Sequence, residues 1–399
     1  MSKGSTLSRP RRAAFSGVAV ALALTACSNG GASSTQSPAA AGASSSVGSA
    51  SATNGSASTS TSASASIAGQ PSLDFKGPNG EKPGGLDQVA LTDAEVVKVK
   101  GGNYKAAFVW HEDSALTKAV EQGARAEFDK LGIKVVASTA AGFDAAKQAD
   151  NVQSVLALKP DIIVTIAVDP TSAAAAFKPA VDQGVKLAIM TTPPKGYTSG
   201  KQIVSIVTGA LTLYGKANAE MLGKALGGKG DIGYMFHDAD FWFTNQRDKA
   251  FKDWTQAEFP DEKIVAEAGF TDPARTEDIA AGMIAKNPNI KGIYVAWATA
   301  AEGVLAALRQ AGRTDIKVVT NDLEATLASD MLRGGNIVGL VNNSSVAIGD
   351  TLAKVGAYGV LGKQAPELVA APPTPVTKDN IVEGWKSDYG TEPPKGVVP

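Results

Sequence analysis

Cysteine is nearly absent from this chain, since Cys27 is the only one among 399 residues. A disulfide framework, a thiolate metal site and a cysteine nucleophile are therefore excluded from the body of the protein, and apolar burial must supply its stability. An excess of positive charge is lacking too, because 38 Lys and Arg residues stand against 39 Asp and Glu residues. Nucleic-acid binding consequently has no electrostatic support.

Signatures of catalysis are also missing. The chain contains no G-x-S-x-G turn and no HExxH motif. The stretch 223–230 comes close to a phosphate-binding P-loop, but Gly230 replaces the magnesium-binding Ser or Thr, and the pattern runs from helix to strand. His111 and His237 have acidic neighbours, yet no metal-ligand spacing motif joins them. We therefore expect no enzyme, no metal site and no cofactor.

An export signal is expected at the start of the sequence. Basic residues up to Arg12 precede the apolar run Ala13–Ala23, which is too short to span a bilayer. The following Leu24-Thr25-Ala26-Cys27 resembles the lipobox of bacterial lipoproteins, which implies lipidation of Cys27. We expect residues 1–27 to be a lipoprotein signal peptide. The mature protein would then be extracytoplasmic and anchored to the cell membrane through its lipid.

Residues 28–102 are expected to form a disordered tether and connector. From Ser28 to Gln70 nearly every residue is Ser, Ala, Thr or Gly, a composition that buries too little apolar area to fold. A connector with charged residues, Gly and Pro follows up to Gly102. Within it, Thr92 and Glu95 have the spacing of a capping box and predict the start of a short helix.

Strand and helix patterns alternate from about residue 103 onward. Short apolar runs such as Ala106–Val109 and Ile162–Ile166 alternate with amphipathic stretches such as Leu116–Leu131. Strands that are apolar on both faces predict parallel sheets covered by helices. The pattern then repeats, because Gly142-Phe143-Asp144 after one strand is echoed by Gly269-Phe270-Thr271-Asp272 after another. The sequence predicts an α/β fold of two similar lobes.

Side chains that directly follow the predicted strands are the candidates for ligand binding. Ligands of open parallel sheets lie beyond the carboxyl ends of the strands, and two facing lobes bring both sets of ends to one cleft. Carboxylates, amides and Arg bind hydroxyl groups, while aromatic faces pack against C–H groups. The candidates placed in this way are Trp110, Asp113, Ser114, Leu116, Thr117, Thr191, Thr192, Asp240, Phe241, Trp242, Asn245, Arg247, Phe270, Thr271, Trp297 and Asp322.

Several stretches together resemble the ribose-binding branch of the type I periplasmic binding proteins. They are Ala149–Gln153 before Lys159-Pro160-Asp161, Ala180–Val185, Arg247–Phe251 and Val318–Asp322. The resemblance covers about residues 104–377 and implies two Rossmann-like lobes with parallel sheets. A three-segment hinge near Val207-Thr208, Leu340–Asn343 and Ala371 would join them. The N-terminal lobe would then comprise 103–207 plus about 344–371, and the C-terminal lobe 208–343 plus about 372–399.

The resemblance also implies roles for individual residues. Arg247 matches an Arg that donates to ligand hydroxyls, Asp322 a carboxylate that accepts from them, and Asn343 an amide at the second hinge crossing. Trp297 stands where the ribose binders have Asn, and Thr191-Thr192 where they have Asp-Arg. The loss of two charged hydroxyl ligands argues against a plain aldopentose. A polyol, a modified sugar or another small polar solute remains open.

We expect a monomeric solute-binding protein that captures such a ligand and delivers it to the permease and ATPase of an ABC importer. A lipid-anchored sensor that presents its ligand to a membrane receptor fits the same features, and neighbouring genes would separate the two. A sugar-responsive transcription regulator would need a helix-turn-helix where the export signal stands. A surface hydrolase would reveal itself by turnover of glycosides.

Overall fold

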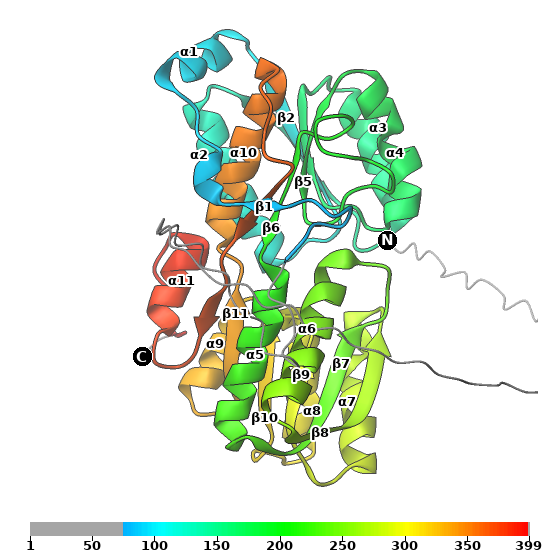
Figure 1. Ribbon diagram of the computed structural model, residues 1–399, viewed down its shortest axis with the longest axis vertical. Coiled ribbons are helices and arrows are strands. Elements are labelled where there is room, and N and C mark those ends of the chain that lie inside the picture. The colour runs from blue at the N-terminus through cyan, green and yellow to red at the C-terminus, as the bar shows by residue number, and fades with distance from the viewer. Residues whose placement is uncertain (1–74, 398–399) are drawn as a thin grey trace, which may run out of the picture. The chain divides into compact units, whose positions relative to one another are not determined.

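The computed structural model describes residues 75–397, which form two α/β lobes (Figure 1). In each lobe helices cover both faces of a mainly parallel sheet, which confirms the predicted fold class. The expected signal peptide, Cys27 and the tether up to residue 74 lie outside the described residues.

The first lobe contains a seven-stranded, all-parallel sheet. Its strands are, in spatial order, β1 (Pro83–Gly84), β12 (Leu368–Ala371), β6 (Ser205–Gly209), β5 (Lys186–Met190), β4 (Ile162–Thr165), β2 (Lys105–Trp110) and β3 (Lys134–Ala140). Helices α2 (Ala115–Lys130) and α10 (Ser345–Leu361) cover one face, and α3 (Ala145–Leu156) and α4 (Pro170–Asp182) the other (Figure 1). The central strands are buried on both sides, as their apolar composition requires.

The segment 75–102 is part of this lobe, which corrects the expectation of a disordered connector as far as residue 102. Its strand β1 pairs with β12, and its side chains Phe75, Val89 and Val99 are buried in the core of the lobe. Helix α1 (Asp93–Gly101) follows the short 3₁₀ helix Leu86–Gln88 and begins with the complete Thr92–Glu95 capping box. A few well-spaced apolar residues are enough to dock this segment, although its composition is polar.

The second lobe contains a six-stranded sheet. Its strands are, in spatial order, β13 (Thr374–Val376), β11 (Ile337–Asn342), β10 (Lys317–Asn321), β9 (Ile290–Val295), β7 (Lys229–His237) and β8 (Asp261–Phe270), of which β13 alone runs antiparallel. Helices α5 (Leu211–Leu226) and α6 (Trp242–Glu258) lie on one face, and α7 (Thr276–Lys286) and α8 (Ala298–Gln310) on the other (Figure 1). The 3₁₀ helix Pro273–Arg275, α9 (Ala325–Leu332) and α11 (Ile381–Tyr389) complete the lobe.

The chain passes between the two sheets three times. It leaves the first sheet after β6 and enters α5, returns from β11 into α10, and passes from β12 into β13. These crossings lie within a few residues of Val207-Thr208, Leu340–Asn343 and Ala371. Three connections near one line allow the lobes to rotate about a common hinge.

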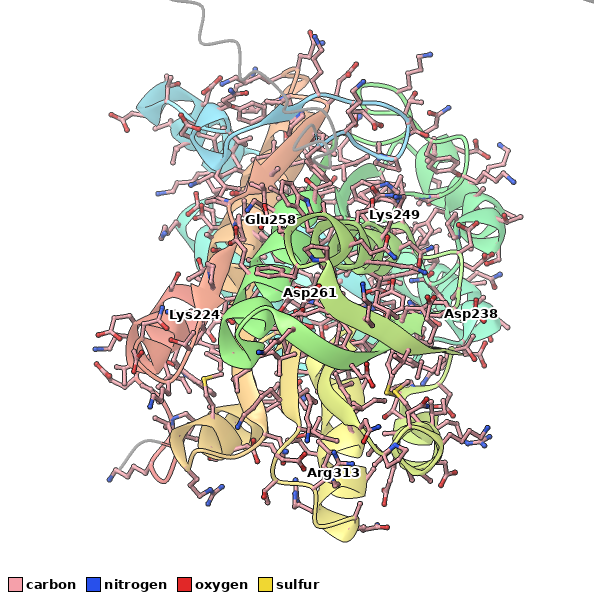
Figure 2. All side chains as sticks on the ribbon, turned by 60° about the horizontal axis from the view of Figure 1, so that its bottom comes forward. Lys224, Asp238, Lys249, Glu258, Asp261 and Arg313 are labelled. Atoms are coloured by element: carbon pink, nitrogen blue, oxygen red, sulfur yellow. The ribbon has the colours of Figure 1, made fainter. Side chains whose placement is uncertain are left out.

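Charges of both signs are interspersed over the surface of the second lobe. Lys224, Asp238, Lys249 and Asp261 are all exposed there (Figure 2). Such a mixture forms no continuous stripe of positive charge that could bind a nucleic-acid backbone on this lobe. Between residues 75 and 397, none of the helices combines the length and the apolar character that a bilayer-spanning segment needs.

Candidate functional site

A small cavity lies where the carboxyl ends of the two sheets meet. The first lobe lines it with His111, Glu112, Leu116 and Phe143. The second lobe lines it with His237, Phe241, Phe243, Thr244, Arg247, Trp297 and Asp322. Its volume is about 30 Å³, enough for about two water molecules. Residues from both lobes therefore face the same partly open cavity, at the place where open parallel sheets bind ligands.

Arg247, Asp322 and Asn343 form a polar cluster on the second-lobe side. Arg247 is 1% exposed, and its Nη2 donates to the Ala296 carbonyl oxygen at 3.1 Å. Its Nη1 lies 3.7 Å from Asp322 Oδ1, and its guanidinium lies 4.2 Å above the Phe243 ring. Asn343 donates from Nδ2 to the same carboxylate. Burial raises the pKa of Asp322, while the Arg247 charge and the Asn343 hydrogen bond oppose this shift.

Several buried polar atoms of this region lack hydrogen-bond partners among the described residues. They are Nε and Nη1 of Arg247, Nε1 of Trp297, Oδ1 of Asn343 and Nδ1 of His111. Buried donors and acceptors are nearly always paired in native proteins, so each of these atoms requires a partner such as water or a ligand. Of these residues, Arg247, Trp297 and His111 line the cavity, whereas Asn343 lies behind Asp322, to which it donates.

Aromatic rings from both lobes enclose the cavity. His111 of the first lobe stacks on Phe241 of the second, with ring centroids 5.7 Å apart. Phe143 meets His111 edge-on at 5.1 Å and lies 6.4 Å from Trp297. Trp297 in turn lies edge-on to His237 at 5.0 Å. The walls thus provide flat apolar faces beside the polar cluster, a combination that suits a ligand with both C–H and hydroxyl surfaces.

The two histidines are neutral at physiological pH. Burial and the proximity of His237 lower the pKa of His111 to about 3, and burial and the Arg247 charge lower the pKa of His237 to about 4. Burial, reinforced by the nearby carboxylates, raises the pKa of Glu112 to about 7. Within residues 75–397 no group of three or more His, Cys, Asp or Glu side chains could hold a metal ion. His111, Glu112 and His237 thus line the cavity as polar groups.

The first-lobe candidates other than Leu116 lie outside the cavity lining. Trp110 points toward α2, where its Nε1 donates to Glu121 Oε2 at 2.8 Å. Asp113 pairs with Lys118 on the surface. The hydroxyls of Ser114 and Thr117 form a capping box at the start of α2, and Thr191 and Thr192 are buried after β5 with their hydroxyls 3.4 Å apart. Only Leu116 of this group reaches the cavity.

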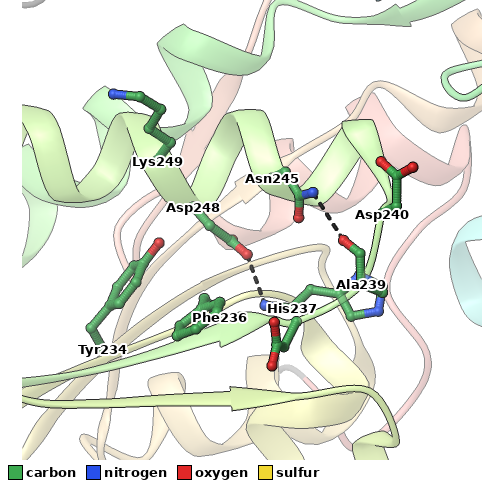
Figure 3. Close-up of a pocket in the computed structure, with 9 residues that line it drawn as sticks. Tyr234, Phe236, His237, Ala239, Asp240, Asn245, Asp248 and Lys249 are labelled. Atoms are coloured by element: carbon green, nitrogen blue, oxygen red, sulfur yellow. Dashed lines mark hydrogen bonds between the residues drawn. The ribbon is translucent and has the colours of Figure 1, made fainter. Parts of the chain in front are cut away.

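The remaining second-lobe candidates surround the cavity without lining it. Asp240 and Asn245 lie in an outer hollow on the flank of the lobe, where Asn245 donates to the Ala239 carbonyl oxygen at 2.9 Å (Figure 3). The Trp242 ring packs on Phe75, 5.8 Å away. The Phe270 ring packs against Trp297, with ring centroids 4.8 Å apart. Thr271, the next residue, lies in a separate surface hollow.

Six residues of the lining were not among the ligand-binding candidates: His111, Glu112, Phe143, His237, Phe243 and Thr244. The internal repeat carried a signal for one of them, because Phe143 occupies the position in the first lobe that Phe270 occupies in the second. Thr244 holds His237 in place, since its Oγ1 lies 2.9 Å from His237 Nδ1. The strand-end position was a signal for two others, because Glu112 follows β2 and Phe243 lies in the first turn of α6 after β7.

Two sheets, three crossings and a partly unsatisfied polar cavity between them define a two-lobed ligand-binding protein. Residues 106–364 match the family described as the periplasmic binding protein domain, and the chain belongs to this family. It is a family of ligand-binding domains and not of enzymes. The identification made from the sequence is thereby confirmed at the level of the family.

Solved structures show the same fold. A solute-binding protein from Agrobacterium vitis, bound with α-D-tagatopyranose, is 22% identical, with a TM-score of 0.66 over 72% of this chain and 98% of that one. A solute-binding protein from Mycobacterium smegmatis, with bound glycerol, is 24% identical, with a TM-score of 0.63 over 70% and 96%. The D-apiose import binding protein of Actinobacillus succinogenes is 39% identical over 82 residues, or 20% of this chain. That match spans 26% of the curated relative's own length.

Proposed function

We propose that this protein is a lipid-anchored, extracytoplasmic solute-binding protein that captures a sugar, a polyol or a related small polar ligand and delivers it to an ABC importer. The observation that carries the proposal is the set of buried polar atoms without hydrogen-bond partners among residues 75–397, on Arg247, Trp297 and His111 of the cavity lining and on the adjacent Asn343. A hydroxyl group both donates and accepts, so one polyhydroxylated molecule supplies what these donors and acceptors lack.

The division of the lining between two lobes supports a capture-and-deliver mechanism. His111, Glu112 and Leu116 come from one lobe, whereas Arg247, Trp297 and Asp322 come from the other. A ligand that contacts both groups stabilises the closed arrangement, because its contacts are complete only when the lobes meet. The permease and its ATPase would recognise this closed form of a monomeric binding protein.

The ligands bound to several structural relatives are rich in hydroxyl groups, which supports a ligand of that kind here. The relatives were described with tagatose, allose, arabinose, myo-inositol or glycerol bound. For attachment at the cell surface, the proposal depends on the lipobox that ends at Cys27, followed by a Ser- and Ala-rich tether. Mass spectrometry of the membrane-bound protein would show a diacylglyceryl group on Cys27 and would contradict the anchor if Cys27 were free.

A thermal-shift screen of the purified chain against pentoses, hexoses, polyols and sugar acids tests the binding function. A ligand at about 100 times its Kd stabilises a protein by about 2.7 kcal/mol, and for a body of this size such a gain raises Tm by about 4 °C. Deleting the gene should then abolish cellular uptake of the same compound. The absence of any shift across these classes would overturn sugar and polyol capture, whereas binding with unchanged uptake would favour the sensor.

A further inference from the structure

Phe143 gives this cleft a feature that its polar residues do not explain. The residue belongs to the loop between β3 and α3 of the first lobe, yet its ring reaches rings of the second lobe. The centroid distances are 6.3 Å to His237, 6.4 Å to Phe241 and 6.4 Å to Trp297. One side chain therefore bridges the lobes directly across the cavity.

The loop that carries Phe143 is held in a fixed conformation. Phe143 has a φ of 61°, in the left-handed region that bulky residues rarely adopt, and Gly142 before it has a φ of 64°. The Phe143 amide donates to the His111 carbonyl oxygen at 2.8 Å, which ties the loop to the neighbouring strand end. Asp144 then caps α3 through Ala146 N and Lys147 N at 2.8 and 3.0 Å. A strained residue that its surroundings hold this firmly is a mark of a functional position.

Contact between rings of opposite lobes leaves the cleft closed down to about 30 Å³. A space for about two waters comes nearest to the smallest polyols. It falls furthest short of a hexopyranose, which is a rigid ring of about 12 non-hydrogen atoms. To enter, a hexopyranose must break the contacts of Phe143 with all three partners.

We propose that Phe143 is the size-limiting residue of the binding site and that it makes the site favour short polyols over hexopyranoses. The inference rests on the proposed function, because it assumes that a hydroxyl-rich ligand occupies this cavity. Phe143 closes the cavity from the first lobe, and Trp297 forms the opposite wall while its indole N–H remains available to the ligand.

Calorimetric titration of the full chain with glycerol, erythritol, ribitol, glucose and allose tests the proposal, in wild type, Phe143→Ala and Phe143→Leu. Wild type should bind one of the three polyols at least about tenfold more tightly than either hexose, and Phe143→Ala should shift this preference toward the hexoses by about tenfold or more. Phe143→Leu should give a smaller shift in the same direction. The matched control is Phe236→Ala, because Phe236 is an aromatic residue of the outer hollow and not of the cavity.

The possible failures are distinguishable. If wild type binds no sugar or polyol at all, the proposed function fails and the size limit fails with it. If wild type binds glucose or allose as tightly as the best polyol, or if neither Phe143 variant changes the ratio, the size limit is wrong while the capture of sugars stands. Melting curves show which variants are folded, and a folded Phe143→Leu suffices if Phe143→Ala does not fold.

Discussion

The role of Arg247 can be tested by replacing it with methionine, which keeps an unbranched apolar stem and removes the charged guanidinium with its hydrogen bonds. Two nitrogens of the wild-type guanidinium, Nε and Nη1, are buried without a hydrogen-bond partner in the part of the chain that the structure describes, although Nη1 lies 3.7 Å from Asp322 Oδ1. A hydrogen bond from a charged donor contributes about 1.5–3 kcal/mol. Since about 1.4 kcal/mol corresponds to a tenfold change in Kd, Arg247→Met should weaken binding by about 10- to 150-fold.

The same substitution should make stability more sensitive to pH. Arg247 opposes the burial that raises the pKa of Asp322, so its removal raises this pKa further. A carboxyl with a higher pKa in the folded than in the unfolded state destabilises the fold as pH rises from the unfolded-state pKa to the folded-state pKa. The loss of Tm in Arg247→Met, relative to wild type, should therefore be greater at about pH 8 than at about pH 5.

Calorimetric titration with the best ligand of the thermal-shift screen measures the loss of affinity. The matched control is Arg125→Met, because Arg125 also lies over a phenylalanine ring and pairs with a carboxylate, but on α2 outside the cavity. Arg125→Met should retain wild-type affinity. A folded Arg247→Met that binds within about twofold of wild type would refute the assignment, because even the weakest charged hydrogen bond predicts a larger change.

Two further substitutions test the packing within each lobe, away from the site. Glu262 is buried with neither carboxylate oxygen hydrogen-bonded among the described residues, and burial raises its pKa to about 7. Because its pKa is raised in the folded state, ionised Glu262 lowers stability as pH rises from the unfolded-state pKa toward 7. Glu262→Gln should therefore raise Tm at about pH 8 and change it little at about pH 4. Equal changes of Tm at the two pH values would contradict this. A Cβ on Gly349 would overlap the Val120 carbonyl oxygen in the α2–α10 contact. Gly349→Ala should therefore lower the free energy of unfolding by about 1–3 kcal/mol in urea titrations, whereas Gly282→Ala, with open space around it, should not.

The architecture was predictable because its signals are local and repeated. Uniformly apolar strands required sheets covered on both faces, and the echo between Gly142-Phe143 and Gly269-Phe270 indicated two similar lobes. The candidates Leu116, Phe241, Arg247, Trp297 and Asp322 line the cavity because strand ends of both lobes converge there. Topology alone was enough to place these residues.

Side-chain direction and competing local bonds were not predictable in the same way. Trp110 ends an apolar strand, but nothing in the sequence tells which face of the sheet its ring takes, and it points to Glu121 on α2. Ser114 and Thr117 form the cap of a helix instead of facing the cavity. The ordered segment from residue 75 was missed because composition averages over the few apolar residues that anchor it.

The most direct test of the account is a crystal structure of the full chain with its tightest-binding sugar or polyol. The account predicts one ligand molecule between the lobes, with hydroxyls bonded to Arg247, Asp322 and Trp297 of the second lobe and to His111 or Glu112 of the first. A ligand bound instead in the outer hollow around Asp240 and Asn245, or held by one lobe alone, would contradict it.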